Sequence, residues 1–383
     1  MQSIKPIKIL FTGGGSGGHI YPIVAVVRAL KISAKGKYPL RLLYLGPKDN
    51  FCRLVLVREG VKVQTIAAGK IRRYLNPLAI MQNIIDSLIK IPFGTIQAFF
   101  KLMFIGPDII FSKGGYGSFP VVMSARILGI PVFLQESDIT PGMASRQIAP
   151  YALEIFTSFP KTEFFPRKKV IAVGNPIRLE LLEGTKESAA KTYNLVGGRP
   201  IIFVMGGSSG AQRINDKILN ILPRLLAQYE VIHQTGIQHI NQLKKEAAFA
   251  APKEALIYYH PFGLANEKEL ADAYAAADLI ISRAGAGSIF EIAASKKPSI
   301  LIPLPEAAQN HQVKNAYAYA AGGAALVFEE NNFTPNLFME KLNNLLSHPE
   351  ILAAMSGAAG EFARPKAAQI IAAYIMQYLT GSK

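Results

Sequence analysis

A glycine-rich loop, Gly13 to Gly18, is the first feature of this chain with clear chemical potential. It follows a short apolar run and precedes a helix-like stretch, so the backbone can approach a phosphate closely beside free helix amides. Gly13, Gly15 and Gly18 also fit a dinucleotide-binding loop, but the second expected strand offers no acid for a ribose before Asp49. A phosphate-binding loop is therefore favoured, with a purely structural turn as the alternative.

His19 closes this loop at the start of the expected helix. The positive end of the helix dipole is expected to lower the pKa of the imidazole and to favour the neutral ring, which accepts a proton. His19 is therefore a candidate base or acceptor-binding residue. A histidine that caps the helix or bonds a nearby backbone group is the alternative, and the two readings weigh about equally.

The second half of the chain repeats the device with the loop Gly206 to Gly210, in which the Ser208 hydroxyl can donate to a phosphate oxygen. Two such loops suggest two phosphorylated ligands. Downstream, residues 282–288 lead into a helix whose early turns carry Glu291. Its carboxylate can accept two hydrogen bonds from a ribose diol, or it can simply stabilise the helix N-terminus.

An amide-rich segment, Asn310 to Asn315, follows a strand and a proline-rich turn. Amides bind sugar hydroxyls well, and a capped helix start is the alternative reading. The sequence contains no D-x-D pair, and no group of His or Cys residues has the spacing of metal ligands. We therefore expect neither a metal nor a cofactor.

Short apolar runs, each followed by turn residues, alternate with helix-like stretches in both halves. This pattern is typical of parallel sheets covered by helices on both faces. Ligands bind beyond the carboxyl ends of the strands in such folds, so a cleft between two doubly wound halves is expected. The expected strands are residues 7–12, 41–45, 109–112, 132–135 and 170–173, then 200–205, 231–234, 257–259, 279–282 and 299–302.

Length and composition support two ordinary domains. The chain has 383 residues, half of them hydrophobic, which excludes a disordered protein. Its single cysteine, Cys52, cannot form a disulfide within the chain, and a reducing cytosol is the expected setting. Lys and Arg outnumber Asp and Glu by 24 to 9 in residues 1–180, but only by 18 to 17 thereafter. The basic half is expected to attract nucleic acid or an anionic membrane.

No segment is predicted to span a membrane or to act as a secretory signal. The nearest approach to a span, residues 91–105, is short and is interrupted by Pro92, Gly94, Gln97 and Lys101. From Lys70 to Lys101 the chain carries five basic residues and a single acid, Asp86. A basic-rimmed apolar patch on the cytoplasmic leaflet is expected, with helices that simply pack on the sheet as the alternative.

Taken together, the motifs resemble those of the MurG family, in order over nearly the whole chain. The resemblance is carried by Gly13 to His19, Gly114-Gly115-Tyr116, Gly174-Asn175-Pro176-Ile177-Arg178, Gly206-Gly207-Ser208, Arg283 to Glu291, Gln312 and Asn315. Members of this family transfer N-acetylglucosamine from UDP-N-acetylglucosamine to undecaprenyl-diphospho-N-acetylmuramoyl-pentapeptide, making lipid II for peptidoglycan. The resemblance implies an α/β fold with two Rossmann-like doubly wound domains facing a cleft, the GT-B architecture. Their expected limits are residues 1–175 and 176–360, with residues 361–383 as a helix that returns to the first domain.

The resemblance also implies roles for individual residues. In the second domain, Arg178 and Ser208 lie near the diphosphate, Glu291 binds the ribose hydroxyls, and Gln312 and Asn315 lie near the sugar. The remaining substrate-binding residues are Ser16, Gly17 and Gly18 in the cleft, Tyr116 with His19 on the acceptor side, Gly263 in the uracil loop, and Ala286, Gly287 and Ser288 before Glu291. The chain departs from the family at Asp138, where asparagine is usual, and Asp138 becomes the second candidate base after His19.

The implied reaction is an inverting, metal-independent displacement at the anomeric carbon through an oxocarbenium-like state. A transferase acting on another lipid acceptor, such as diacylglycerol, is the alternative. A nucleic-acid-binding protein would explain the basic half, but no recognised motif supports it and no nucleic-acid partner is expected. The expected partners are UDP-N-acetylglucosamine, an undecaprenyl-linked acceptor and the anionic cytoplasmic face of the membrane, to which the protein would attach peripherally.

Overall fold

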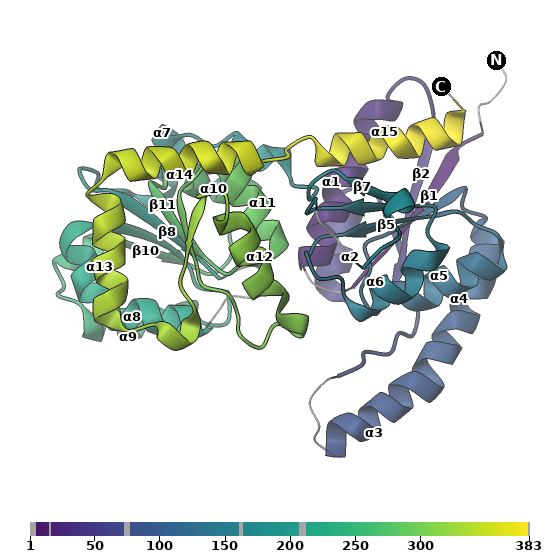
Figure 1. Cartoon of the computed structure of the whole chain (residues 1–383), viewed down its shortest axis with the longest axis horizontal. Helices are drawn as coiled ribbons and strands as arrows, with labels where there is room; N and C mark the ends of the chain where they lie inside the picture. The colour runs from purple at the N-terminus through teal and green to yellow at the C-terminus, as the bar shows by residue number, and fades with distance from the viewer. Residues whose placement is uncertain (1–4, 15–16, 73–76, 161–163, 207–211, 382–383) are drawn as a thin grey trace. The chain divides into compact units, whose positions relative to one another are not determined.

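The computed structural model describes residues 5–14, 17–72, 77–160, 164–206 and 212–381. The chain forms two compact units, one comprising Met1–Ile177 with Pro365–Lys383 and the other Arg178–Arg364. Each unit holds a parallel sheet with helices packed on it (Figure 1). This confirms the predicted doubly wound α/β class.

The first unit is built on a seven-stranded sheet in the order β3-β2-β1-β4-β5-β6-β7. Every neighbouring pair is parallel, for example β1 with β2 and β1 with β4. The strands are β1 (Ile7–Thr12), β2 (Leu40–Gly46), β3 (Lys62–Thr65), β4 (Ile109–Ser112), β5 (Val132–Glu136), β6 (Glu154–Thr157) and β7 (Val170–Ala172).

Both faces of this sheet are buried, which explains the continuous apolar runs in its strands. Along β1, Ile9 and Phe11 face a core shared with the first and last helices, whereas Leu10 faces the opposite core. The helices are α1 (Gly17–Ala34), α2 (Asn50–Arg58), α3 (Pro77–Ile85), the π-helical turn η1 (Asp86–Lys90), α4 (Ile91–Ile105), α5 (Ser118–Ile127), α6 (Met143–Ile148) and α15 (Ala367–Thr380), with short turns η2 (Ala149–Tyr151) and η3 (Arg167–Lys169).

The second unit repeats the plan with a six-stranded parallel sheet in the order β10-β9-β8-β11-β12-β13. Its strands are β8 (Ile201–Met205), β9 (Glu230–Gln234), β10 (Tyr259–Phe262), β11 (Leu279–Ser282), β12 (Ser299–Leu301) and β13 (Ala325–Val327). Its helices are α7 (Lys186–Tyr193), α8 (Gln212–Gln228), α9 (Ile240–Ala250), α10 (Glu267–Ala276), α11 (Ala286–Ala294), α12 (His311–Ala320), α13 (Pro335–Leu346) and α14 (Pro349–Phe362), with turns η4 (Leu179–Leu182), η5 (Ala255–Tyr258), η6 (Ala308–Asn310) and η7 (Glu330–Asn332). The carboxyl ends of β8, β11 and β12 lead into the segments that carry most of the predicted donor residues.

The strand predictions were wrong at one place and incomplete at three. Residues 257 and 258 belong to the turn η5, and β10 begins only at Tyr259. The strands β3, β6 and β13 were not predicted. β3 is an edge strand whose Lys-Val-Gln-Thr sequence lacks the apolar pattern of the central strands. β13, also at an edge, is apolar but only three residues long.

A second correction concerns the apolar segment of the first unit. Helices α3, η1 and α4 follow one another without a break from Pro77 to Ile105, and this helix is long and apolar enough, by length and composition alone, to cross a membrane. Pro92 does not end the helix. It stands just after the π-helical turn η1, where the regular α-helical hydrogen bonding is already altered. Only 17% of its most apolar window is buried.

Candidate active site

At the carboxyl edge of the first sheet, two glycine segments enclose the ring of His19. A Cβ atom at Gly14 would lie 3.1 Å from His19 Nδ1, and one at Gly115 would lie 2.9 Å from His19 Nε2. Gly114 and Gly115 also have φ of +72° and +78°, which side chains rarely adopt. Glycine is therefore required for this close approach. His19 and the Gly114-Gly115-Tyr116 motif, which were both predicted as site residues, lie together at this edge of the sheet.

Gly17 and Gly18 form the first turn of α1, the 18-residue helix that follows β1. Their backbone amides belong to the helix end that attracts anions. Ser16, the third residue predicted here, lies outside the described residues.

Tyr116 lies beside a second tyrosine at this edge. The Tyr44 hydroxyl donates to Gly13 O at 3.2 Å, which holds the end of β1 against β2. Burial raises the pKa of Tyr116, and the negative charges of Asp49 and of the Cys52 thiolate would raise it further. The Tyr116 phenol therefore stays neutral at physiological pH and can donate a hydrogen bond to a ligand oxygen.

A buried charge cluster that the sequence did not reveal lies next to this motif. Lys113 follows β4 and Glu136 ends β5, and both side chains are buried. Burial lowers the pKa of the Lys113 ammonium and raises that of the Glu136 carboxyl, while the opposite charges of the two groups limit both shifts. Ser145 and the backbone N–H of Asp138 donate to Glu136. Asp138, the second candidate base, is thus held beside Glu136 at the same edge.

The Gly-Asn-Pro part of the Gly174–Arg178 motif acts as a structural tie. Asn175 is buried, and its Oδ1 accepts hydrogen bonds from Ser137, Ser158 and Gln135. These residues follow or belong to β5 and β6, so the amide joins the ends of two strands to the segment that leaves the first unit. The motif ends at Arg178, the first residue of the second unit.

In the second unit, Arg178 and Glu291 form an ion pair. Arg178 Nη2 donates to Glu291 Oε1 at 3.1 Å, and the Tyr274 hydroxyl donates to Glu291 Oε2 at 3.1 Å. Glu267 approaches the same guanidinium at 3.6 Å. The sequence placed Arg178 and Glu291 on different parts of the donor, whereas the structure joins them. A ribose diol would therefore share the Glu291 carboxylate with these two protein donors.

The N-terminus of α11 offers open backbone amides at the carboxyl end of β11. Its N-cap residue, Gly285, supplies no side-chain hydrogen bond, and Ala286, Gly287 and Ser288 form the first turn. Cβ atoms at Gly285 and Gly287 would meet nothing within 4 Å. Neither backbone strain nor internal packing requires glycine there, so the two positions leave room for a ligand beside the helix end.

The two predicted amides of α12 differ in their surroundings. Gln312 is half-buried, and its Oε1 accepts a hydrogen bond from Leu304 N–H at 3.0 Å. Asn315 is fully buried and donates from Nδ2 to Ala284 O at 3.3 Å, which supports the segment before α11. Gln312 is therefore the better placed of the two for direct contact with a ligand.

Gly263 and Ser208 complete the predicted donor residues. Gly263 O accepts from Gly236 N–H at 3.0 Å, and a Cβ atom at Gly263 would lie 3.2 Å from Ile237 Cα. This glycine therefore allows two loops at the ends of β9 and β10 to pack closely. Ser208 lies outside the described residues.

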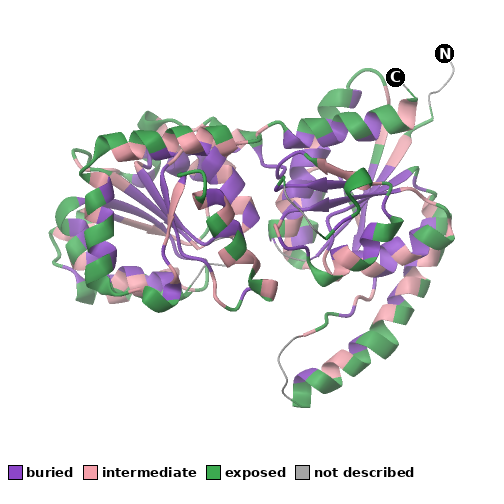
Figure 2. Ribbon diagram, in the orientation of Figure 1, coloured by how far each residue is buried: buried purple, intermediate pink, exposed green. Residues whose placement is uncertain are grey.

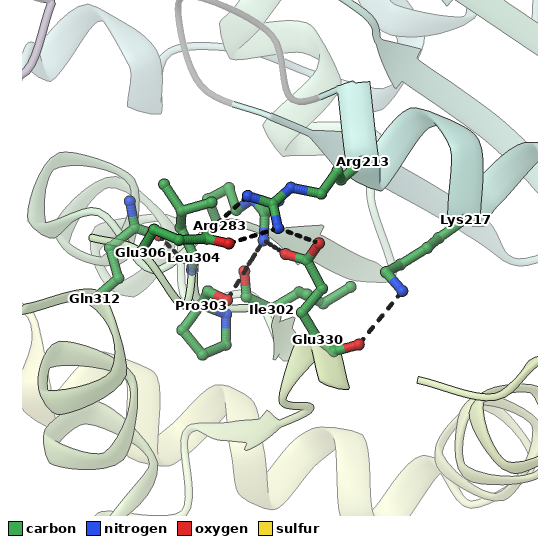
Figure 3. A network of polar contacts seen from close by, with 9 residues as sticks. All are labelled: Arg213, Lys217, Arg283, Ile302, Pro303, Leu304, Glu306, Gln312 and Glu330. Carbon is green, nitrogen blue, oxygen red and sulfur yellow. Dashed lines mark hydrogen bonds and ion pairs between the residues drawn. The ribbon is translucent and has the colours of Figure 1, made fainter. Parts of the chain in front are cut away.

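A polar network that the sequence did not suggest lies at the carboxyl edge of the second sheet (Figure 3). Arg213, in the first turn of α8, forms two hydrogen bonds with Glu306, at 3.0 and 2.6 Å, and an ion pair with Glu330 at 3.4 Å. Arg283 Nη1 donates to Glu330 at 2.6 Å. Among the residues that the structure describes, no group of three or more His, Cys, Asp or Glu side chains is arranged to hold a metal ion.

Comparison with known proteins relates the whole chain to one group of enzymes. Residues 9–157 match the glycosyltransferase family 28 N-terminal domain, and residues 201–371 match the corresponding C-terminal domain. A UDP-N-acetylglucosamine–N-acetylmuramyl-(pentapeptide) pyrophosphoryl-undecaprenol N-acetylglucosamine transferase of Clostridium kluyveri is 34% identical over 374 residues, which cover 96% of this chain and 99% of the relative. The enzyme of the same name from Treponema denticola is 34% identical over 97% of this chain and 98% of its own.

Solved structures agree with these relatives. The crystal structure of Acinetobacter baumannii MurG superposes with a TM-score of 0.72 at 25% identity, over 97% of this chain and all of that one. A glycosyltransferase of kitacinnamycin gives a TM-score of 0.71 at 15% identity, a likeness of fold alone. The sequence identity to the curated transferases over nearly their full length shows that the chain belongs to the MurG family of glycosyltransferases.

Proposed function

We propose that this chain transfers N-acetylglucosamine from UDP-N-acetylglucosamine to undecaprenyl-diphospho-N-acetylmuramoyl-pentapeptide, in the synthesis of peptidoglycan. The observation that carries the proposal is the relationship, over nearly the whole chain, to transferases named for this reaction. The geometry supports it, because each sheet ends in a glycine-lined helix N-terminus suited to a phosphorylated ligand.

The second unit is proposed to bind the donor. The first turn of α11 and the Arg178 guanidinium would face the diphosphate, and Glu291 would accept hydrogen bonds from the ribose. As the anomeric bond breaks, UDP leaves with the electron pair and negative charge grows on its terminal phosphate. Helix amides and a fixed guanidinium stabilise that charge without having to reorganise. Gln312 is assigned to the sugar.

The first unit is proposed to bind the acceptor. The hydroxyl of the acceptor sugar attacks the anomeric carbon from the face opposite UDP, so an α-linked donor gives a β-linked product. Its proton passes to a base, for which His19 is the first candidate and Asp138 the second. The ring of His19 is held by Gly14 and Gly115, and the neutral Tyr116 phenol can orient the acceptor.

The donor and the acceptor are tested together by transfer of label from radiolabelled UDP-N-acetylglucosamine. Labelled product is expected with undecaprenyl-diphospho-N-acetylmuramoyl-pentapeptide as the acceptor. A second lipid that carries the same diphospho-sugar should compete with it for the label. Diacylglycerol should neither accept label nor compete. Transfer to diacylglycerol in preference to the diphosphate lipid would establish the alternative, a transferase of another lipid acceptor.

Attachment to the membrane surface is proposed for the helix Pro77–Ile105. Most of its large apolar side chains are exposed along the helix (Figure 2). Its other face is bound to the first unit, because Gln97 Oε1 accepts from Ala67 N–H and Ser124 Oγ donates to Thr95 O. A helix fixed in this way to its own domain can lie in the membrane interface without crossing it. We place this surface on the cytoplasmic leaflet, where the nucleotide sugar is available.

A further inference from the structure

The segment before α12 holds two consecutive strained residues. Gln309 has φ 56° and ψ 24°, and Asn310 has φ 58° and ψ 28°, both in the left-handed region that favours glycine. Such backbone costs free energy and persists only where the surrounding structure fixes it, which is most often at a ligand site. The contacts of residues 304–310 therefore indicate what this strain serves.

One contact that holds the segment is the ion pair between Glu306 and Arg213. Both Nη atoms of Arg213 bond Glu306, at 3.0 Å to Oε1 and 2.6 Å to Oε2, in the paired geometry that suits a guanidinium and a carboxylate. The segment is thereby joined to the first turn of α8, the helix that follows β8 (Figure 3).

The Arg213 side chain is itself held from the other side. Its Nη1 lies 3.4 Å from Glu330 Oε1, and Glu330 Oε2 accepts from Arg283 Nη1 at 2.6 Å. Arg283 also donates to Ile302 O, two residues before the same segment. Two cations and two carboxylates thus balance each other in one network (Figure 3).

This arrangement fixes the orientation of the Gln312 amide. Its Oε1 is occupied by Leu304 N–H, at the beginning of the strained segment. The NH2 group of the same amide donates to none of the residues that the structure describes, so it is the end available to a ligand. A donor group of this kind recognises an acceptor atom, such as a sugar hydroxyl or carbonyl oxygen.

We propose that Arg213 and Glu306 are positioning residues of the donor site: their ion pair holds residues 304–310 in the strained conformation in which Gln312 presents its NH2 group to the sugar nucleotide. This inference rests on the proposed function, which assigns the donor to the second unit. Exposed ion pairs contribute little to stability, so a merely structural pair would leave the kinetics unchanged. Glu306 and Arg213 are both well exposed, and their variants are expected to fold.

The test is a double-mutant cycle of Arg213→Gln, Glu306→Gln and the two together, in the full-length protein. Each single variant is expected to raise the donor KM about fivefold to tenfold, because the strained segment relaxes and Gln312 loses its orientation. The double variant should raise it by no more than either single variant, because the two side chains act as one unit. The acceptor KM should be unchanged and kcat should stay within twofold.

The matched control is Arg224→Gln, which removes an exposed arginine from the same helix and should leave the donor KM unchanged. The inference is overturned if the single variants leave the donor KM unchanged, or if their effects multiply in the double variant. It is overturned equally if the acceptor KM rises in parallel. A wild-type enzyme that fails to use UDP-N-acetylglucosamine would instead refute the proposed function, and the wild-type assay separates these two failures.

Discussion

At the scale of single residues, the side chain of Glu291, which we propose to bind the ribose, is also a partner of two other protein side chains. A carboxylate alone at a ribose would be free to turn, but Arg178 and Tyr274 each hold one of its oxygens. These two contacts fix the carboxylate plane before any ligand binds. If Glu291 binds the donor as we propose, this preorganisation lowers the entropic cost of donor binding.

Replacing Glu291 with Gln should raise the donor KM about tenfold or more, because a neutral amide loses the charge-assisted bonds both to Arg178 and to the ribose. The acceptor KM should not change. Glu267→Gln is the control, because it removes a more exposed carboxylate that faces the same guanidinium at 3.6 Å. Steady-state kinetics with each substrate varied in turn provide the measurement, and equal donor KM values for the two variants would remove Glu291 from the donor site.

The two candidate bases can be separated by conservative variants. His19→Gln or Asp138→Asn, whichever removes the base, should lower kcat by about 10²- to 10⁴-fold with little effect on either KM. Single-turnover transfer, which isolates the chemical step, is the appropriate measurement. Because the family usually carries Asn at residue 138, we expect the large loss with His19→Gln and a small one with Asp138→Asn. The reverse ranking would assign the base to Asp138.

The site residues that could be predicted from the sequence were those that belong to motifs with a recognisable spacing. Glycine loops and the residues beside them, such as His19 and Glu291, stand at fixed offsets from strand ends and were predicted together. The ion pairs of Arg213, Glu306 and Glu330 join segments far apart in the chain and carry no local pattern. Lys113 directly precedes a recognised glycine motif, but its burial beside Glu136 depends on the pairing of β4 with β5.

At the scale of elements, most central strands were predictable because both of their faces are buried. The interior strand β6 and the edge strands β3 and β13 were missed, whereas the edge strand β7 was predicted. Buried hydrogen bonds between side chains also connect elements, and the apolar pattern of the sequence does not predict them. His233 of β9 is buried, with Nδ1 bonded to the Tyr259 hydroxyl at 2.8 Å and Nε2 to Asn215 Oδ1 at 3.1 Å. It thereby links two neighbouring strands to α8.

Burial lowers the pKa of His233 from 6.5 to about 3. Between pH 6.5 and pH 3, His233 therefore binds a proton in the unfolded chain but not in the folded chain. The free energy of unfolding that is present above pH 6.5 is lost as the pH falls towards 3. At pH 4.5 the loss should be about 2 to 3 kcal/mol. His233→Gln, which cannot titrate, should lack this part of the pH dependence.

Urea unfolding of both proteins at pH 7.5 and pH 4.5 gives the difference directly. The wild type is expected to lose more stability than His233→Gln over this interval, whatever the other groups contribute in common. Equal losses in the two proteins would show that His233 does not titrate differently in the folded and unfolded chains.

At the scale of the whole molecule, the positive charge is concentrated in the unit that we propose binds the acceptor and the membrane. The first unit carries all of the excess of Lys and Arg over Asp and Glu, and it also carries the exposed apolar helix. The basic rim is smaller than the sequence suggests, because the buried Asp86 pairs with Arg72 at 2.8 Å and with Lys90 at 2.6 Å. Substitution of Arg72 would therefore damage the helix itself, and apolar side chains make the cleaner test.

Leu88, Ile89 and Phe104 are the side chains to replace, because they are 72%, 61% and 81% exposed. Burying one such side chain in the membrane interface contributes about 1.5 to 3 kcal/mol when complete. The triple serine variant should therefore bind vesicles containing anionic lipid at least 100-fold more weakly, as measured by sedimentation. Its donor KM should be unchanged, because these positions belong to the first unit.

Phe249→Ser, which removes an aromatic ring that is 93% exposed in the second unit, should bind the vesicles like the wild type. If the triple variant kept its affinity for the vesicles, the helix Pro77–Ile105 would not be the membrane-binding surface, and the basic residues elsewhere in the first unit would have to account for attachment.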